Sequence, residues 1–229
     1  MAMGQSIAPG VTYCLAGGRV IFMDLRTGRF SGLPPRHEEA FIASITGQAT
    51  ATLAPSTAAF LTARKLCVES DAADLRVPVI PLPQIDLLDL TAPTTSASLG
   101  LSLLGAIAQA RAEMALRTLS FRSLTERLRR RKRMVAAAPE EGCEQEADMQ
   151  FALLEAAIRR TDLLLPPSNR CLGRSIAFLS MALSQNLAPD LVIGVRSNPF
   201  RAHAWVQSRG RVIHDDQRQA PLFTPIFML

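Results

Sequence analysis

Residues 199–215 read Pro-Phe-Arg-Ala-His-Ala-Trp-Val-Gln-Ser-Arg-Gly-Arg-Val-Ile-His-Asp, and this stretch decides the fold of the second half of the chain. Residues 202–207 and 211–213 are strand-like, and the Ser-Arg-Gly sequence at 208–210 between them suits a hairpin turn. The apolar run 191–195 upstream is continuous, which indicates a buried strand. We therefore expect an antiparallel sheet in this part of the chain.

The hairpin brings a histidine and a carboxylate into one region. It places His203 on one arm and Asp215 just beyond the other. Because neighbouring residues of a strand point to opposite faces, only one of His214 and Asp215 should face His203. A carboxylate is the better group to orient an imidazole, so we assign that role to Asp215. Asp216 is the alternative if the strand ends early.

A cysteine upstream lies at the start of an apolar helical run. Residues 171–175 read Cys-Leu-Gly-Arg-Ser and open a helix that we expect to reach about Gln185. A thiol at a helix N-terminus can become a thiolate, because the helix dipole and the free N–H groups favour the anion. Cys171, His203 and Asp215 occur in the helix–strand–strand order that nucleophilic catalysis needs. The three residues predict a cysteine nucleophile that acts on an acyl group.

The neighbours of Cys171 have two possible roles. Arg174 and Ser175 lie in the first turn of the predicted helix, where they could support the thiolate or form ordinary helix surface and N-terminal hydrogen bonds. Candidates for the oxyanion hole are the backbone N–H of Cys171 and, more weakly, the side chain of Asn169. The other three cysteines are expected to be structural or incidental; they are Cys14, Cys67 and Cys143.

Helices precede the cysteine. We expect them at about 97–116, 123–137 and 144–161, the last with apolar residues at helical spacing on one face. A central helix packed on antiparallel strands, with the cysteine on the helix and the histidine and aspartate on neighbouring strands, is the papain and transglutaminase arrangement. The fold class is therefore α+β in this half.

The first third of the chain has a different pattern. Three short strands are expected, followed by two or three short helices, which is a winged-helix-like order. The strands lie at 11–15, 19–24 and 29–33, and the helices at about 37–46 and 55–67. Residues 86–96 are rich in Pro, Thr and Ser in their second half and mark the domain boundary. The predicted organisation is a domain at 1–85, a linker at 86–96 and a domain at 97–229.

The cysteine content and the apolar segments of the chain indicate its cellular compartment. The 229-residue chain has four cysteines and no Cys-x-x-Cys pair, which argues against a disulfide framework and a zinc site. No N-terminal stretch resembles a secretory signal, and the apolar run 97–108 is too short and too rich in Ser and Gly to span a bilayer. We therefore expect a cytoplasmic protein that does not enter a membrane, in a reducing compartment that suits a free catalytic thiol.

The net positive charge of the chain comes from one segment. Nine basic and two acidic residues lie in 111–133, so this segment carries +7, and the remainder carries −2 of the overall +5. The densest part is the run from Arg127 to Arg133. It is either a solvated helix face or a surface for an acidic partner, a nucleotide or nucleic acid.

The residues around the cysteine, histidine and aspartate carry a resemblance to a known family. The segments 171–175, 191–195, 199–206 and 210–215 resemble the lasso peptide biosynthesis B protein, the transglutaminase-like leader peptidase. The close match covers about 60 residues. The first third resembles the precursor recognition element of systems that make ribosomally synthesised, modified peptides, here fused ahead of the peptidase. One departure is His214, where a small polar residue is expected.

The resemblance implies that the N-terminal domain binds the leader of a precursor peptide as an added β-strand. The groove would lie between the strand at 29–33 and the helix at about 56–67. Candidate leader-binding residues are Arg29, Phe30, Ser31, Leu33, Phe60 and Arg64. Ordinary core and surface positions are the alternative for Phe30, Phe60 and Arg64.

The resemblance also implies that the C-terminal domain cuts leader from core, with Cys171 as nucleophile, His203 as base and then acid, and Asp215 as the orienting group. The family's partner, an ATP-using lasso cyclase, then joins the new amine to a carboxylate of the core. Family members can depend on ATP for cleavage. The sequence contains no P-loop, so we expect no nucleotide site and no cofactor on this chain.

Two other functions are alternatives to the leader peptidase. A transglutaminase-like acyl transferase or amidase would use the same three residues on another substrate. A DNA-binding regulator would concentrate its cations on a reading helix, whereas the candidate helix carries only Arg64 and Lys65. We therefore expect no binding to DNA.

Overall fold

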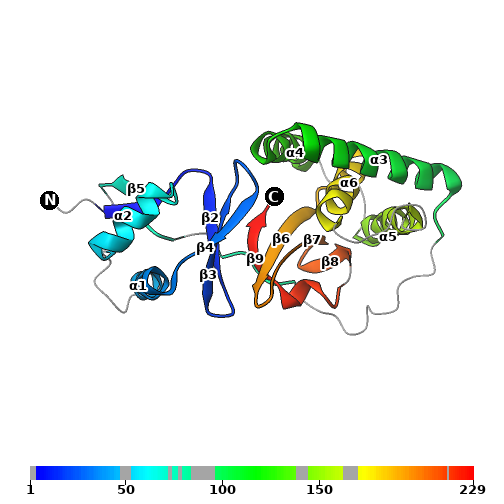
Figure 1. Cartoon of the computed structure of the whole chain (residues 1–229). Helices are drawn as coiled ribbons and strands as arrows, with labels where there is room; N and C mark the ends of the chain where they lie inside the picture. The colour runs from blue at the N-terminus through cyan, green and yellow to red at the C-terminus, as the bar shows by residue number, and fades with distance from the viewer. Residues whose placement is uncertain are drawn as a thin grey trace.

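The structure is a computed structural model with helices and strands in both halves of the chain (Figure 1). It describes residues 4–46, 53–71, 74–76, 79–83, 96–137, 144–161, 170–215 and 217–229. The N-terminal strands and short helices form one side of the molecule, and the longer helices and a second sheet form the other (Figure 1). The predicted mixed α+β architecture is confirmed in this form.

The C-terminal sheet is antiparallel, with strand order β8-β7-β6-β9. Its strands are β6 (Asp190–Ser197), β7 (Phe200–Ser208), β8 (Arg211–His214) and β9 (Thr224–Met228). Arg209 and Gly210 form the hairpin turn with φ of 51° and 79°, the positive pair that tight hairpins favour. The hairpin predicted from sequence is therefore confirmed, whereas β9 was not predicted, because its five residues include Pro225, which is unfavourable in strands.

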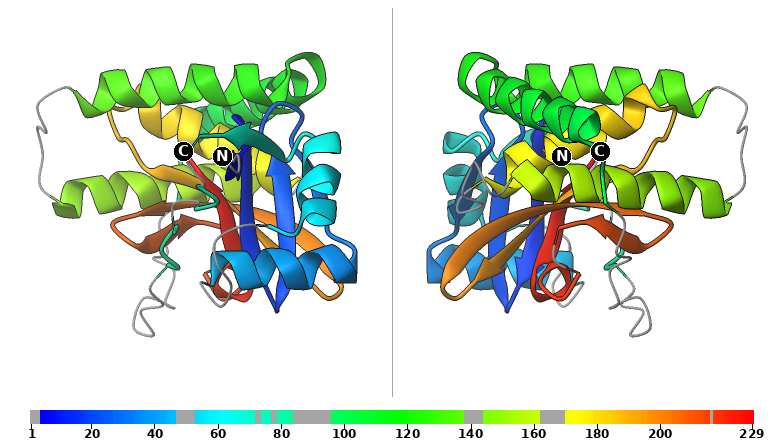
Figure 2. Two further views of the ribbon diagram at one scale, coloured as in Figure 1. Left: turned by 90° about the vertical axis from the view of Figure 1, so that its left-hand side faces the viewer. Right: turned by 90° about the vertical axis from the view of Figure 1, so that its right-hand side faces the viewer.

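Four helices cover one side of this sheet. They are α3 (Leu99–Thr118), α4 (Phe121–Ala136), α5 (Glu144–Thr161) and α6 (Cys171–Ser184). Figure 2 shows α6 enclosed between α3 and α5 and the strands, and α6 contacts α3, α5, β6 and β7. Nine of its 14 residues are buried, so α6 is the central helix that the sequence predicts.

The N-terminal sheet has three antiparallel strands in the order β2-β3-β4. The strands are β2 (Val11–Ala16), β3 (Arg19–Asp24) and β4 (Arg29–Gly32), followed by α1 (Pro35–Ile45) and α2 (Pro55–Ala63). The three strands and two helices agree with the prediction. Proline at the first position of each helix supplies a preset φ where no N–H bond is needed.

One part of this region was predicted wrongly. The second helix ends at Ala63 instead of about Cys67, because Lys65 adopts a φ of 58° and reverses the chain. The residues that follow form β5 (Cys67–Ser70), which pairs with β1 (Gly4–Ile7) in a separate two-stranded ribbon. That pairing joins segments about 60 residues apart in sequence, which local periodicity does not reveal.

The N-terminal sheet is buried on both faces. One face packs Tyr13 and Phe22 against Phe41 of α1 in a cluster of its own. The other face places Ile21 and Met23 in the same core as α6 and the C-terminal sheet. The two halves of the chain therefore share a hydrophobic core. The predicted boundary segment 86–96 lies outside the described residues except for Ser96, so the domain limits stay a prediction.

Gly194 sits at the centre of the C-terminal sheet, opposite His203 on β7. A Cβ atom added there would lie 2.8 Å from ring atoms of Trp205 and 2.8 Å from the Cβ of Phe223. Only a residue without a side chain allows these two aromatic groups to pack under β6. Gly194 thereby fixes the surface on which His203 rests.

We predict that Gly194→Ala lowers the free energy of unfolding by about 1 to 3 kcal/mol, because overpacking forces buried groups to shift. Urea unfolding of the purified variant measures this change. Gly100→Ala is the matched control, since a Cβ at Gly100 of α3 meets no atom within 4 Å and alanine favours the helix. Equal stability of the Gly194→Ala variant and the parent would contradict the packing argument.

Candidate active site

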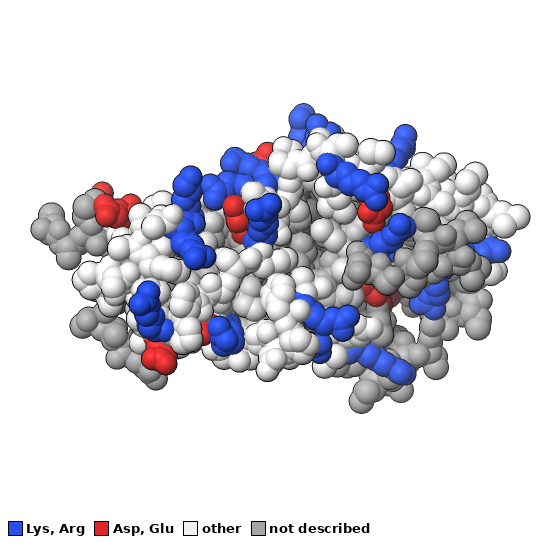
Figure 3. All heavy atoms as spheres, viewed as in Figure 1, with Lys and Arg blue, Asp and Glu red and all other residues white. Residues whose placement is uncertain are grey.

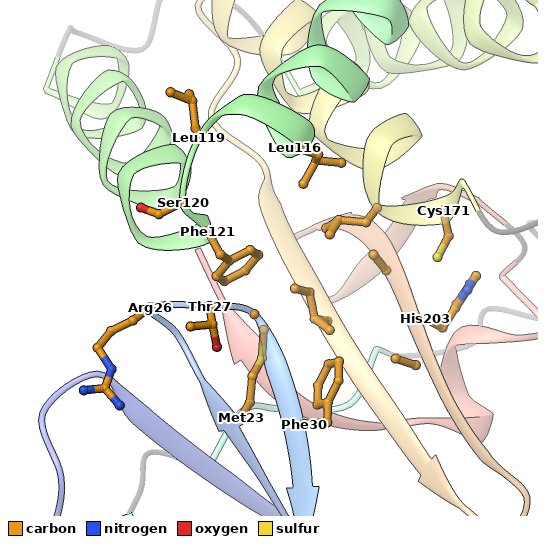
Figure 4. Close-up of a pocket in the computed structure, with 15 residues that line it drawn as sticks. Met23, Arg26, Thr27, Phe30, Leu116, Leu119, Ser120, Phe121, Cys171 and His203 are labelled. Atoms are coloured by element: carbon orange, nitrogen blue, oxygen red, sulfur yellow. The ribbon is translucent and has the colours of Figure 1, made fainter. Parts of the chain in front are cut away.

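Cys171 is the first residue of α6 and is half-buried. Its side chain lies beside the imidazole of His203, with the sulfur directed toward the ring (Figure 4). Both residues line the same cavity. The structure thus brings the predicted nucleophile next to the predicted base.

His203 and Asp215 form a close pair. The Nε2 atom of His203 lies 3.2 Å from Oδ2 of Asp215, and their side chains are only 12% and 16% exposed. Asp215 reaches this position with a φ of 83°, a left-handed conformation that aspartate adopts more readily than most residues. The assignment of Asp215 rather than His214 to this face agrees with the geometry. Asp216 and Asn169 lie outside the described residues.

The imidazole of His203 rests on aromatic groups. Its ring centroid lies 5.0 Å from that of Phe223 and 6.2 Å from that of Trp205. Trp205 is fully buried and donates its indole N–H to Gln207 at 3.1 Å. This packing limits the positions that the ring of His203 can take.

A hydrogen bond joins the cysteine helix to the histidine strand. The hydroxyl of Ser175, one turn after Cys171, donates to the carbonyl oxygen of Ala204 at 3.0 Å, and Ser175 is fully buried. Ala204 follows His203 directly, so this bond fixes the positions of Cys171 and His203 relative to each other. Sequence reasoning left the role of Ser175 open, and its signal was the one-turn spacing from Cys171.

His214, the residue before Asp215, forms a separate ion pair with Glu155. His214 is buried, its Nδ1 contacts a carboxylate oxygen of Glu155 on α5, and its ring stacks on Phe178 of α6 with 4.7 Å between centroids. Arg159 contacts the other oxygen of Glu155 at 3.3 Å. Burial favours the neutral form of Glu155, but the charges and hydrogen bonds of His214 and Arg159 outweigh it and hold the pKa of this carboxyl below its ordinary value. This pair anchors the end of β8 and was not predicted from sequence.

The environment of Cys171 favours the protonated thiol. Burial raises the pKa of Cys171 above its ordinary value, and the nearby carboxylate of Asp215 raises it further. Hydrogen bonds from the backbone N–H groups of Ala204, Leu172 and Cys171 itself act in the opposite direction without reversing the shift. The thiol therefore needs a base to lose its proton, and His203 is the group in position.

The cavity beside these residues has a volume of about 420 Å³. The N-terminal hairpin between β3 and β4 forms one wall, and the start of α4, the start of α6 and β7 form the others (Figure 4). Large apolar side chains dominate the lining, namely Met23, Phe30, Leu116, Phe121, Leu172 and Ile193. Sequence reasoning did not place any residue of β3 near the reactive cysteine.

The six residues predicted to bind a leader do not share one surface. Phe30 pairs with Met23 across β3 and β4, and its ring lies 5.6 Å from that of Phe200 on β7. It therefore faces the C-terminal half and the cavity. The other two predicted residues of β4 are Arg29 and Ser31.

The remaining three lie on the opposite side of the sheet or in its core. Phe60 of α2 stacks on the buried ring of His37 of α1 with 4.3 Å between centroids, and the guanidinium of Arg64 lies 5.0 Å from the centroid of Phe60. Leu33 is buried in the N-terminal core. A groove between β4 and α2 could use Phe60 and Arg64 but not Phe30.

The basic run lies on α4 and is partly structural. Lys132 binds the carboxylate of Asp190 at the start of β6 and donates to the carbonyl oxygen of Leu229 at 2.9 Å. Most of the arginines of the run are exposed, and Figure 3 shows basic side chains over the region of α3 and α4. Their role stays open between a solvated face and a partner surface.

Two further properties concern only the described residues. Within the described ranges, no cluster of three or more His, Cys, Asp or Glu residues could hold a metal ion. Among the helices that the structure describes, none is long and apolar enough to cross a membrane.

Comparison with known proteins identifies relatives of the C-terminal half of the chain. Residues 115–228 match the family model Transglut_core3, described as the transglutaminase-like superfamily. The microcin J25-processing protein McjB of Escherichia coli is 47% identical over 45 residues, which cover 20% of this chain and 22% of McjB. This chain therefore aligns with only about a fifth of McjB. No solved structure matches the chain significantly.

We predict that alkylation of Cys171 by iodoacetamide rises with pH through a midpoint above about 8.5, the ordinary value for cysteine, because the thiolate is the reactive form. Mass spectrometry of tryptic peptides measures the rate at each pH. Cys143 is replaced by serine because it lies outside the described residues. Burial raises the pKa of Cys14 to about 12 and that of Cys67 to about 11, so these two serve as slow internal references. Fast alkylation that persists at pH 6 would instead indicate a preformed thiolate–imidazolium pair.

We also predict that Glu155→Gln lowers the free energy of unfolding at pH 7 by about 2 kcal/mol, the usual contribution of a hydrogen bond to a charged group. Because the pKa of Glu155 is lowered on folding, its stabilisation is present above about pH 4.3 and is lost as the pH falls through the lowered value. Urea unfolding of the parent and the variant measures this change at pH 7 and again at pH 4 and below. The difference in the free energy of unfolding between the two proteins should be smaller at the acidic pH values. Glu146→Gln, at an exposed position of the same helix, is the control. A difference that stays the same at every pH would contradict the ion-pair explanation.

Proposed function

Because residues 115–228 form a transglutaminase-like core domain, we propose that this chain is a cysteine peptidase that binds a ribosomal precursor peptide and cuts its leader from its core during lasso peptide maturation. The observation that carries the proposal is the placement of Cys171 and His203 on one cavity, with Asp215 paired to His203. The similarity to a microcin-processing protein supports a peptide as the substrate.

The proposed chemistry begins with proton transfer. Asp215 contacts Nε2 of His203, so Nδ1 is the ring nitrogen that would take the proton of the Cys171 thiol. The sulfur then attacks the scissile carbonyl carbon and forms a tetrahedral intermediate. The carboxylate of Asp215 stabilises the imidazolium that forms and holds its orientation.

Collapse of the intermediate breaks the peptide C–N bond. His203 returns the proton to the departing nitrogen, which becomes the amino terminus of the core. The leader stays on Cys171 as a thioester until water attacks it, with His203 as the base, and the thiol is restored. The backbone N–H of Cys171 at the start of α6 is the candidate donor to the oxyanion in both steps.

The N-terminal sheet is the proposed recognition element for the leader. Within the part of the chain that the structure describes, no strand pairs with the outer edge of β4. A peptide in extended form could add to such an edge and bond to its backbone, with Arg29 and Ser31 nearby. Phe60 and Arg64 stay candidates for side-chain contacts on the α2 side.

The partner of this reaction is proposed to be an ATP-using lasso cyclase, which would join the freed amine to a carboxylate of the core. Any dependence of cleavage on ATP would act through that partner, and this chain is proposed to need no cofactor of its own. The reaction suits the reducing cytoplasm, where a thiol stays free.

A second function has support from the family match. Transglutaminase-like domains can pass an acyl group from a cysteine to an amine, and the three residues of this site could do the same. The product separates the two functions: hydrolysis gives two shorter peptides, whereas acyl transfer gives a new amide.

The test uses the purified chain and a short precursor peptide, which we expect to be encoded beside its gene, with and without the cyclase and ATP. We expect mass spectrometry to show release of the leader at one bond. The rate of this release should fall by at least about 10³-fold in Cys171→Ala, because no other group supplies the nucleophile. Cys67→Ala, at a buried cysteine away from the site, controls for thiol loss. Release at the same rate in Cys171→Ala would overturn the proposed nucleophile, and a new amide product would favour the acyl transferase.

A further inference from the structure

We infer that the cavity between the N-terminal hairpin and the start of α6 is a binding subsite for one large apolar side chain of the peptide substrate, next to the bond that Cys171 attacks. This inference rests on the proposed peptidase function and names the substrate feature that the site selects. It assigns the N-terminal sheet a role in the cleavage site itself, in addition to any binding of the leader.

The position of the cavity supports a subsite next to the reacting bond. Cys171 and His203 lie at one end of the lining, and Met23 and Phe30 of the N-terminal sheet lie toward the other (Figure 4). A peptide with its scissile carbonyl at the sulfur of Cys171 must therefore place a neighbouring side chain at or in the cavity.

The lining explains why that side chain should be apolar. It consists mainly of aliphatic and aromatic carbon, with hydroxyl groups from Thr27 and Ser120. Among the described residues of the lining, the arginine is Arg26. It pairs with both carboxylate oxygens of Asp24, at 2.9 and 3.2 Å, and its guanidinium points away from the other labelled side chains (Figure 4). A charged substrate side chain would lose its hydration without gaining an unpaired opposite charge.

The size of the cavity admits such a group. Its volume of about 420 Å³ falls in the range of about 300 to 1,000 Å³ that ligand pockets occupy. Apolar side chains bind in such spaces because water is released from both surfaces. The cavity is therefore large enough for a leucine, methionine or phenylalanine side chain.

Close packing holds the hairpin wall in place. Gly28, with a φ of 72°, lies against the ring of Phe121 at the start of α4, where a Cβ atom would come within 3.2 Å of it. Phe121 in turn packs on Phe227 of β9 with 5.7 Å between ring centroids. Phe30 packs on Phe200 from the other side. These contacts tie the N-terminal wall to the C-terminal sheet, so the cavity has a defined shape that can select a side chain.

The test measures selectivity in the precursor peptide. Each of the three residues on either side of the cut is replaced in turn by leucine and by aspartate, and kcat/KM for leader release is measured by mass spectrometry with the unmodified enzyme. We expect one position where leucine exceeds aspartate by about 100-fold, the order of discrimination that an apolar pocket achieves. Ratios within about threefold at all six positions would overturn the subsite, while the peptidase function would stand.

A variant enzyme locates the selectivity in the cavity. Phe30→Ala enlarges the space and should reduce the preference for leucine over aspartate at that position by about 10-fold. Met149→Ala is the control, because Met149 on α5 is exposed and does not line the cavity. Because each variant is judged by a ratio of two substrates, a change in leader binding cancels. An unchanged ratio in a folded Phe30→Ala enzyme would overturn the proposed site, and no cleavage of any precursor by the unmodified enzyme would instead refute the proposed function.

Discussion

Burial of α6 against the C-terminal sheet is the constraint on which the active site depends. The helix is enclosed by α3, α5 and the strands, so its apolar residues cannot move without opening the core. Cys171 lies at the one end of α6 that reaches the cavity. The bond from Ser175 to Ala204 then fixes that end relative to β7. The proposed nucleophile and the proposed base, from segments about 30 residues apart, are thereby held together.

Two buried pairs use opposite sides of the end of β8. His214 points toward the helices and binds Glu155, whereas Asp215 turns toward His203. His214 is the last residue of β8, and Asp215 lies one residue beyond it with a left-handed φ, so the two pairs come from consecutive positions. The left-handed φ of Asp215 carries a local cost that the anchored His214 helps to offset. His214 departs from the pattern of the family that the sequence resembles, and its pair with Glu155 gives a physical explanation: it fastens the strand that leads to Asp215.

Local signals predicted what depends on local structure. The Arg-Gly turn, the helix that begins at Cys171 and the alternation at His214 and Asp215 were all readable, because turn chemistry and strand periodicity act over a few residues. Pairing of β1 with β5, the strand β9 and the ion pair of Glu155 were missed, since each joins distant segments. The orientation of Phe30 was also beyond local reasoning. Phe30 lines the cavity because its face of the sheet, which also carries Met23, packs against the core of α6 and the C-terminal sheet.

In the proposed function, the shared core would connect leader recognition to the chemistry of cleavage. If the N-terminal sheet were a separate module, it could raise the local concentration of a leader but could not affect the geometry of cleavage. Here the hairpin of β3 and β4 forms a wall of the cavity that contains Cys171 and His203. A leader that binds the outer edge of β4 would lie on the strand whose Phe30 lines that cavity, only one residue from Ser31. Ordering β4 would then stabilise the cavity wall, since both depend on the same four-residue strand. Binding of the correct leader and fitting of the side chain next to the cut would support each other.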